Sequence, residues 1–111
     1  MASIFVQVIN TLIVADTTVN EFVTTCNRLN DPNISFVGNQ LNDNSIGGLA
    51  SNAFIAWQQF KIARQALIDA DLMSNPDWIT IYDSLGVQRE RLGRNVPAMY
   101  AYFNCFQISL G

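Results

Sequence analysis

Three arginines stand close together near the carboxyl end of the sequence, in the run RERLGR. Arg89, Arg91 and Arg94 are followed by Tyr100 and Tyr102. Guanidinium groups bind phosphates and carboxylates, often through two parallel hydrogen bonds, so the cluster predicts a contact with phosphate or with an acidic partner. The alternative is structural, because cations are also favoured in the last turn of a helix. The sequence leaves both interpretations open.

The acidic residues do not form a pair suited to catalysis. Asp69 and Asp71 fall on different faces of a helix, and Asp83 and Glu90 are two helical turns apart, which is typical of a solvated face. The sequence has no histidine, the residue that most often acts as a general base or metal ligand. It also lacks a nucleophile elbow and a phosphate-binding loop. We therefore expect no enzymatic activity, no metal and no cofactor.

The two cysteines, Cys26 and Cys105, are separated by most of the chain and form no CxxC pair. Cys26 lies on an apolar seam, which favours a buried side chain that packs as a small hydrophobe. A disulfide between the two thiols would require the first and last helices to be neighbours. The spacing alone leaves that pairing open.

The elements that must position these residues are predicted to be helices. Apolar residues recur at steps of three and four near the N-terminus, which predicts a long helix over 4–29. Its start, IFVQVI, is rich in β-branched residues and could instead form an edge strand. Pro32 follows the helix and cannot continue it, so a long polar connector is expected over 30–48.

Three further helices are expected over about 49–73, 76–92 and 97–109. Asn75 followed by Pro76 is typical of a helix start. Gly86 is an alternative place for a break within the third helix. The predicted fold class is therefore all-α, a bundle-like single domain of four helices with a long connector between the first two.

Apolar side chains cover more of the first two helices than one core-facing stripe requires. The helix predicted over 49–73 is apolar around most of its circumference, and the first half of the helix over 4–29 is similar. A small domain has too little material to cover these flanks, so we expect other chains to contact them. The predicted contact residues are Ile4, Val6, Ile9, Ile13, Phe54, Ile55, Trp57, Ile62, Tyr100 and Tyr102.

The composition also favours contact with other subunits. Only 14% of the residues are charged, whereas ordinary soluble proteins have about 25%. Protein interfaces are depleted in charge in the same way. The net charge of −3 does not favour binding to nucleic acid, which requires a basic face. The sequence shows neither a secretory signal nor an apolar run long enough to span a membrane, so we expect a soluble cytoplasmic protein.

These observations predict a non-enzymatic structural subunit that self-associates or docks into a larger protein assembly. Low charge, abundant Asn and Thr, and small size fit a component of a virus or phage particle. One alternative is a small monomeric inhibitor or immunity-type protein, whose apolar flanks would form a single patch. Another is a carrier of an apolar small ligand, which would need a cavity between the second and fourth helices.

Overall fold

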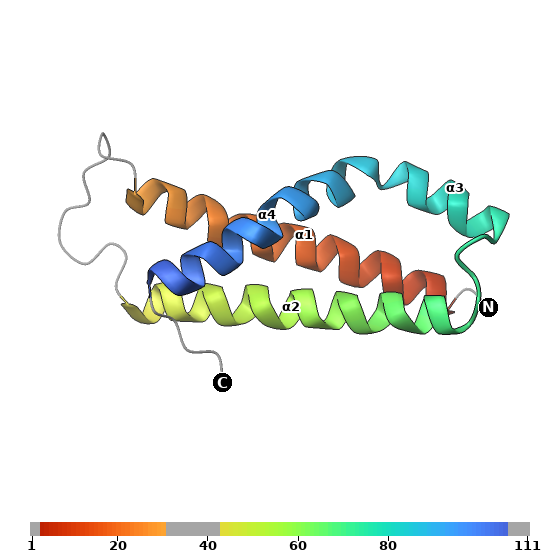
Figure 1. The fold of residues 1–111 in the computed structure, drawn as a ribbon, viewed down its shortest axis with the longest axis horizontal. Helices are drawn as coiled ribbons and strands as arrows, with labels where there is room; N and C mark the ends of the chain where they lie inside the picture. The colour runs from red at the N-terminus through yellow and green to blue at the C-terminus, as the bar shows by residue number, and fades with distance from the viewer. Residues whose placement is uncertain (1–2, 31–42, 107–111) are drawn as a thin grey trace.

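Four helices follow one another in the computed structural model, which describes residues 3–30 and 43–106. They are α1 (Ser3–Asn30), α2 (Asp43–Asp69), α3 (Pro76–Ser84) and α4 (Gly86–Cys105). α1 and α2 lie side by side and antiparallel, and α4 lies across α1 (Figure 1). The described residues contain no strand, so the predicted all-α, bundle-like fold is confirmed.

The apolar seam of α1 lies at the centre of the core. Val8, Val19 and Phe22 are almost completely buried, at the three- and four-residue steps that the sequence shows. The β-branched start of the helix is helical, because burial against the other helices outweighs its preference for strands. Thr11 and Thr18 each donate a hydroxyl hydrogen bond to the carbonyl one turn earlier, so these polar side chains are satisfied within the helix.

α2 begins earlier than the sequence predicted. Residues 43–48, expected in the connector, form the first turns of the helix. Ile46 lies within them and is buried in the core, and this burial offsets the conformational cost of Gly47 and Gly48 in a helix. The rest of the predicted connector, 31–42, lies outside the described residues.

α2 also ends earlier than predicted, in a Schellman turn. Asp71 adopts the left-handed conformation, with φ of 57°. Its N–H donates to the carbonyl of Ile68 at 2.9 Å, and the N–H of Leu72 donates to the carbonyl of Leu67 at 3.2 Å. These two bonds satisfy the last carbonyls of the helix. The predicted extension of this helix to residue 73 was wrong. Leu72 continues the apolar pattern of the helix, but an apolar residue is equally suited to the position just after a Schellman turn, where Leu72 lies.

α3 starts as predicted. The side chain of Asn75 accepts a hydrogen bond of 2.9 Å from the N–H of Asp77, and Pro76 occupies the first turn, where its missing N–H is not needed. The predicted end at residue 92 was wrong, since α3 stops at Ser84. The chain breaks at Leu85, next to the glycine that the sequence offered as an alternative.

α4 continues through the proline that was predicted to start a separate helix. Leu92, Met99 and Phe103 are buried along one side of α4, so a single core-facing stripe spans both sides of Pro97. Proline cannot donate to the carbonyl of Gly93, but both residues are exposed and water can reach that carbonyl. Burial of the stripe therefore outweighs the missing hydrogen bond. Residues 107–109 of the predicted last helix lie outside the described residues.

A ladder of polar contacts holds α4 beside α1. Its three rungs each join residues 75 positions apart in the sequence, which is the pattern of two helices that run in the same direction. The rungs are Arg91 to Asp16, Asn95 to Asn20 and Tyr102 to Asn27. This ladder fixes the register of the two helices, and the buried stripe of Leu92, Met99 and Phe103 lies beside it on α4.

Candidate partner-binding groove

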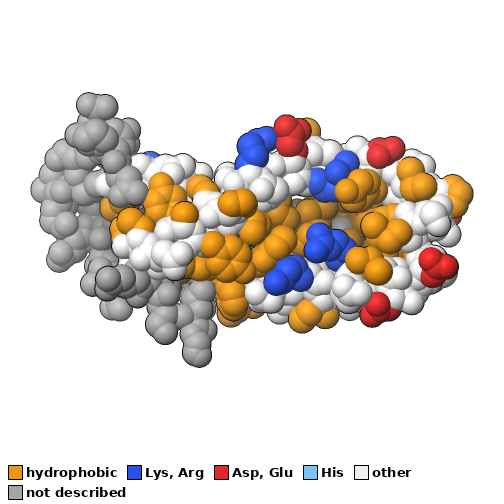
Figure 2. Space-filling model, viewed as in Figure 1, with side chains coloured by type: hydrophobic (Ala, Val, Ile, Leu, Met, Phe, Trp, Pro, Cys, Tyr) orange, Lys and Arg blue, Asp and Glu red, His pale blue; other side chains and the backbone are white. Residues whose placement is uncertain are grey.

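An open groove runs between α2 and the arm formed by α3 and α4. After the turn that follows α2, α3 runs back apart from α2, and α4 continues in the same direction and crosses α1 (Figure 1). The groove has a volume of about 1020 Å³, and Val8 and Leu12 of α1 contribute to its lining. Figure 2 shows hydrophobic side chains along this hollow and Lys and Arg side chains beside it. The groove is therefore an apolar surface with a cationic margin.

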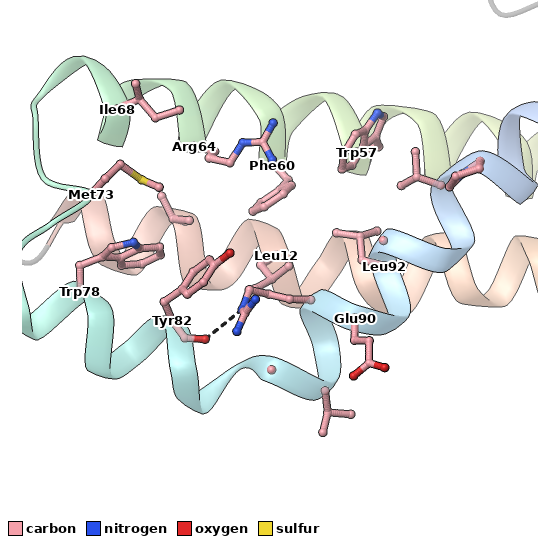
Figure 3. A pocket seen from close by; sticks show the side chains of 17 residues that line it. Leu12, Trp57, Phe60, Arg64, Ile68, Met73, Trp78, Tyr82, Glu90 and Leu92 are labelled. Atoms are coloured by element: carbon pink, nitrogen blue, oxygen red, sulfur yellow. Dashed lines mark hydrogen bonds between the residues drawn. The ribbon is translucent and has the colours of Figure 1, made fainter.

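One wall of the groove is a single side of α2. Trp57, Phe60, Arg64 and Ile68 line the groove at helical spacing along α2, and the Phe60 ring points from α2 into the groove (Figure 3). The rings of Trp57 and Phe60 are 5.9 Å apart. The guanidinium of Arg64 lies 5.5 Å from the centre of the Phe60 ring, and the ammonium of Lys61 lies 5.6 Å from that of Trp57. The cations thus lie over aromatic faces at the margin of the groove.

The opposite wall depends on one anchor, Trp78. It is the buried residue of α3, and its ring stacks on Phe5 of α1 with a separation of 5.6 Å. Tyr82 lies next to it at 5.9 Å and is 40% exposed. Trp78 is therefore the fully buried attachment of α3 to the core, and the half-buried Ile81 adds to it, while Tyr82 beside Trp78 is partly exposed (Figure 3).

Arg89 closes the junction between α3 and α4. Its guanidinium lies 3.6 Å from the centre of the Tyr82 ring, and its Nε donates a hydrogen bond of 3.0 Å to the Tyr82 carbonyl, drawn as a dashed line in Figure 3. The Tyr82 carbonyl belongs to the last turn of α3, which is the negative end of that helix, so a cation beside it is favoured. Arg89 therefore has a structural role and also contributes to the lining of the groove.

The other two arginines of the predicted cluster have partners of their own. Arg91 binds Asp16 on α1, with Nη2 to Oδ2 at 2.7 Å, and Arg94 binds Glu90 one turn away on α4 at 3.2 Å. Arg91 thus faces α1, whereas Arg89 faces the groove. The structure does not bring the three guanidinium groups together into one anion site.

The predicted apolar contact residues divide into two groups. Exposed ones are Val6, Ile13, Ile55, Ile62 and Tyr100, with exposed fractions between 38% and 70%. Half-buried ones that pack against the core are Ile4, Ile9, Phe54, Trp57 and Tyr102. Trp57 is the member that lines the groove. Ile55 and Ile62 are two turns apart on the other side of α2, so they form a separate surface.

Four large, exposed hydrophobic residues of the groove were not among the predicted contacts. They are Ile68, Met73, Tyr82 and Val87, with exposed fractions between 40% and 76%. Ile68 carried a signal in the sequence, because it shares a flank of α2 with Trp57. Met73, Tyr82 and Val87 lie in α3 or close to its ends. Their position beside α2 could not be predicted, because it depends on the break in the chain at Leu85.

The two cysteines are free. Cys26 is completely buried and Cys105 is exposed. Burial, with a smaller contribution from the nearby Cys105, raises the pKa of the Cys26 thiol to about 11. The thiol of Cys26 is therefore protonated at neutral pH and shielded from reagents.

In the part of the chain that is described, no helix has both the length and the hydropathy needed to cross a bilayer. The same residues contain no group of three or more acidic, cysteine or histidine side chains that could hold a metal ion. No protein-family model, curated protein or solved structure matches this chain.

Proposed function

We propose that this protein is a non-catalytic helical subunit that docks into a larger protein assembly. The observation that carries the proposal is the groove, which is apolar and open along one side. Extended apolar surfaces of soluble proteins commonly mark contacts with other molecules. A groove between helices is also the shape that receives an amphipathic helix. A protein partner fits both the chemistry and the form of the site.

A second apolar surface supports more than one neighbour for each subunit. Ile55 and Ile62 are 51% and 70% exposed and lie on the side of α2 that faces away from the groove. A monomeric inhibitor would need a single patch directed at its target. Apolar side chains on two sides of the same helix favour a subunit with contacts on both.

A carrier of an apolar small ligand is the second candidate, because the groove lies between α2 and α4 and contains Trp57 and Trp78. Small-ligand sites enclose most of the surface of their ligand. Here Met73, Tyr82 and Val87 of the lining are 44%, 40% and 76% exposed, so the groove does not enclose its contents completely. Its form is therefore better suited to a protein than to an enclosed ligand.

The amino-acid composition supports a proposal for the kind of assembly that contains this subunit. The low fraction of charged residues and the abundance of Asn and Thr support a subunit made in the cytoplasm and incorporated into a particle such as a virion.

The mass of the protein in solution tests this proposal. We expect light scattering behind size exclusion to show a defined oligomer or growing particles as the concentration rises. Ile68→Gln should weaken the groove contact, and Ile62→Gln should weaken the contact on the other side of α2. Both residues are exposed and glutamine is a good helix former, so each variant should fold. A monomer of 12.4 kDa at every concentration would contradict self-association.

A further inference from the structure

Charged side chains beside the groove form two groups of opposite sign. The cation cluster consists of Lys61, Arg64, Arg89 and Arg94. The acid cluster, which extends from the end of α2 through the turn and along α3, consists of Asp69, Asp71, Asp77 and Asp83. Figure 2 shows Lys and Arg side chains beside the middle of the hollow, with an acidic side chain next to them, and further acidic side chains toward one end. The face therefore has a positive middle and a negative end.

Most of these charges have no partner of opposite sign within the described residues. The ion pairs found there are Arg91 with Asp16 and Arg94 with Glu90. Lys61, Arg64 and Arg89 are thus without a carboxylate, and no member of the acid cluster pairs with a cation. All four aspartates are exposed. A surface that carries both clusters, in which Arg94 alone is paired among the described residues, is complementary to itself.

We propose that a second copy of this chain covers the groove, in a twofold dimer in which the cation cluster of each copy faces the acid cluster of the other. A twofold axis perpendicular to the groove face, midway between the two clusters, would superimpose each cluster on the opposite one. Such an interface uses the same surface on both subunits and makes every contact twice. The inference rests on the proposed docking function and names the partner.

Apolar burial and charge have different roles in this dimer. Pairing the two faces removes Ile68, Met73, Tyr82 and Val87 from water, and this burial provides most of the affinity. Exposed ion pairs contribute little to affinity by themselves. Complementary charges instead fix the orientation, because a parallel arrangement would place the two cation clusters against each other.

Two charge-reversed variants test the arrangement. One is Lys61→Glu with Arg64→Glu, and the other is Asp69→Lys with Asp83→Lys. These substitutions break none of the ion pairs of the fold. Asp69 and Asp83 lie near the ends of α2 and α3, where lysine is favoured by the helix dipole, so the second variant should fold well. Arg28→Glu, at the end of α1, is the control for net charge.

Sedimentation of the full chain at low salt should show a dimer whose dissociation constant rises about tenfold or more in either reversed variant alone. An equimolar mixture of the two should restore the dimer, because the heterodimer has one native contact and one in which the reversed clusters face each other. The control should dimerise like the wild type, and added salt should weaken the wild-type dimer.

Three results would overturn the inference, and they separate it from the proposed function. A dimer that is insensitive to both reversed variants but weakened by Ile68→Gln would retain docking at the groove and reject the charge pairing. A dimer insensitive to all three variants would reject the groove as the contact surface. A wild-type monomer up to about millimolar concentration, beyond the range of specific dimers, would reject the second copy as the partner.

Discussion

Arg91 of α4 binds Asp16 of α1 through two parallel hydrogen bonds, from Nε to Oδ1 at 2.8 Å and from Nη2 to Oδ2 at 2.7 Å. The carboxylate is almost completely buried, whereas 41% of the arginine side chain is exposed. These bonds raise the pKa of the Arg91 guanidinium, which therefore stays charged. The pair has the same sequence separation as the other rungs of the α1–α4 ladder, so it contributes to the register that leaves the groove open.

The unequal burial of the two partners predicts unequal effects of substitution. Arg91→Met should lower the free energy of unfolding by about 3 kcal/mol, because it leaves the Asp16 carboxylate buried without a cation. Asp16→Asn should lower it by only about 1 kcal/mol, since Arg91 can turn to water. Urea denaturation measures both values. Arg94→Met removes an exposed pair and is the control, with a change within about 0.5 kcal/mol. Equal losses for the two partners would show that the burial of Asp16 does not govern the pair.

The attachment of α3 through Trp78 gives a second prediction. Trp78→Ala should destabilise the protein by about 3 kcal/mol, because it removes the buried ring that stacks on Phe5. Hydrogen exchange in α3 should rise more than in α1, since α3 has no other buried residue. Ile79→Ala, at an exposed neighbour in the same helix, is the matched control. Unchanged exchange in α3 would indicate that contacts other than Trp78 hold the helix.

The fold class could be predicted from the sequence because the apolar residues of the first helix recur at helical spacing and are the same residues that the core buries. The three- and four-residue spacing that includes Val8 and Phe22 is the pattern that the core uses. The start of α3 was also predictable, because Asn75 and Pro76 act through bonds to their immediate neighbours.

The groove could not be predicted, because it depends on where the chain turns between α3 and α4. Pro97 is a strong local signal for a helix boundary, and the sequence contains no equally strong signal at Leu85. The deciding contribution is the burial of Leu92, Met99 and Phe103 against α1, which is a tertiary effect. Because the chain breaks at Leu85, α3 is short and Tyr82 lies beside Arg89. Both features shape the groove.

The Schellman turn at the end of α2 gives a third prediction. Asp71 has a positive φ, which costs free energy in a residue with a side chain and little in glycine. Asp71→Gly should therefore raise the free energy of unfolding by about 0.5 kcal/mol, and Asp71→Val should lower it by about 1 kcal/mol or more. Thermal unfolding measures both. Ala66→Gly, at an exposed position inside the same helix, is the contrasting control and should be destabilising. A loss of stability in Asp71→Gly would contradict the role of backbone conformation at this site.

The buried thiol of Cys26 predicts a loss of stability in alkali. The pKa of this thiol is about 11 in the folded chain, above the ordinary value of 9.0. Below pH 9 the thiol is protonated in both states, so it adds no pH dependence. As the pH rises from 9 to 11 the unfolded chain loses the proton while the folded chain keeps it. Unfolding is then favoured by up to about 2–3 kcal/mol.

The difference between the wild type and Cys26→Ala isolates this contribution, because the two proteins differ only at this side chain. Urea denaturation at pH 8 and pH 10.5 should show a smaller alkaline loss of stability in Cys26→Ala than in the wild type. Cys105→Ala should retain most of the wild-type loss, since burial is the larger cause of the raised pKa. In the folded wild type at pH 8, a thiol reagent should modify only the exposed Cys105. Equal alkaline losses in all three proteins would show that Cys26 is not protected by the core.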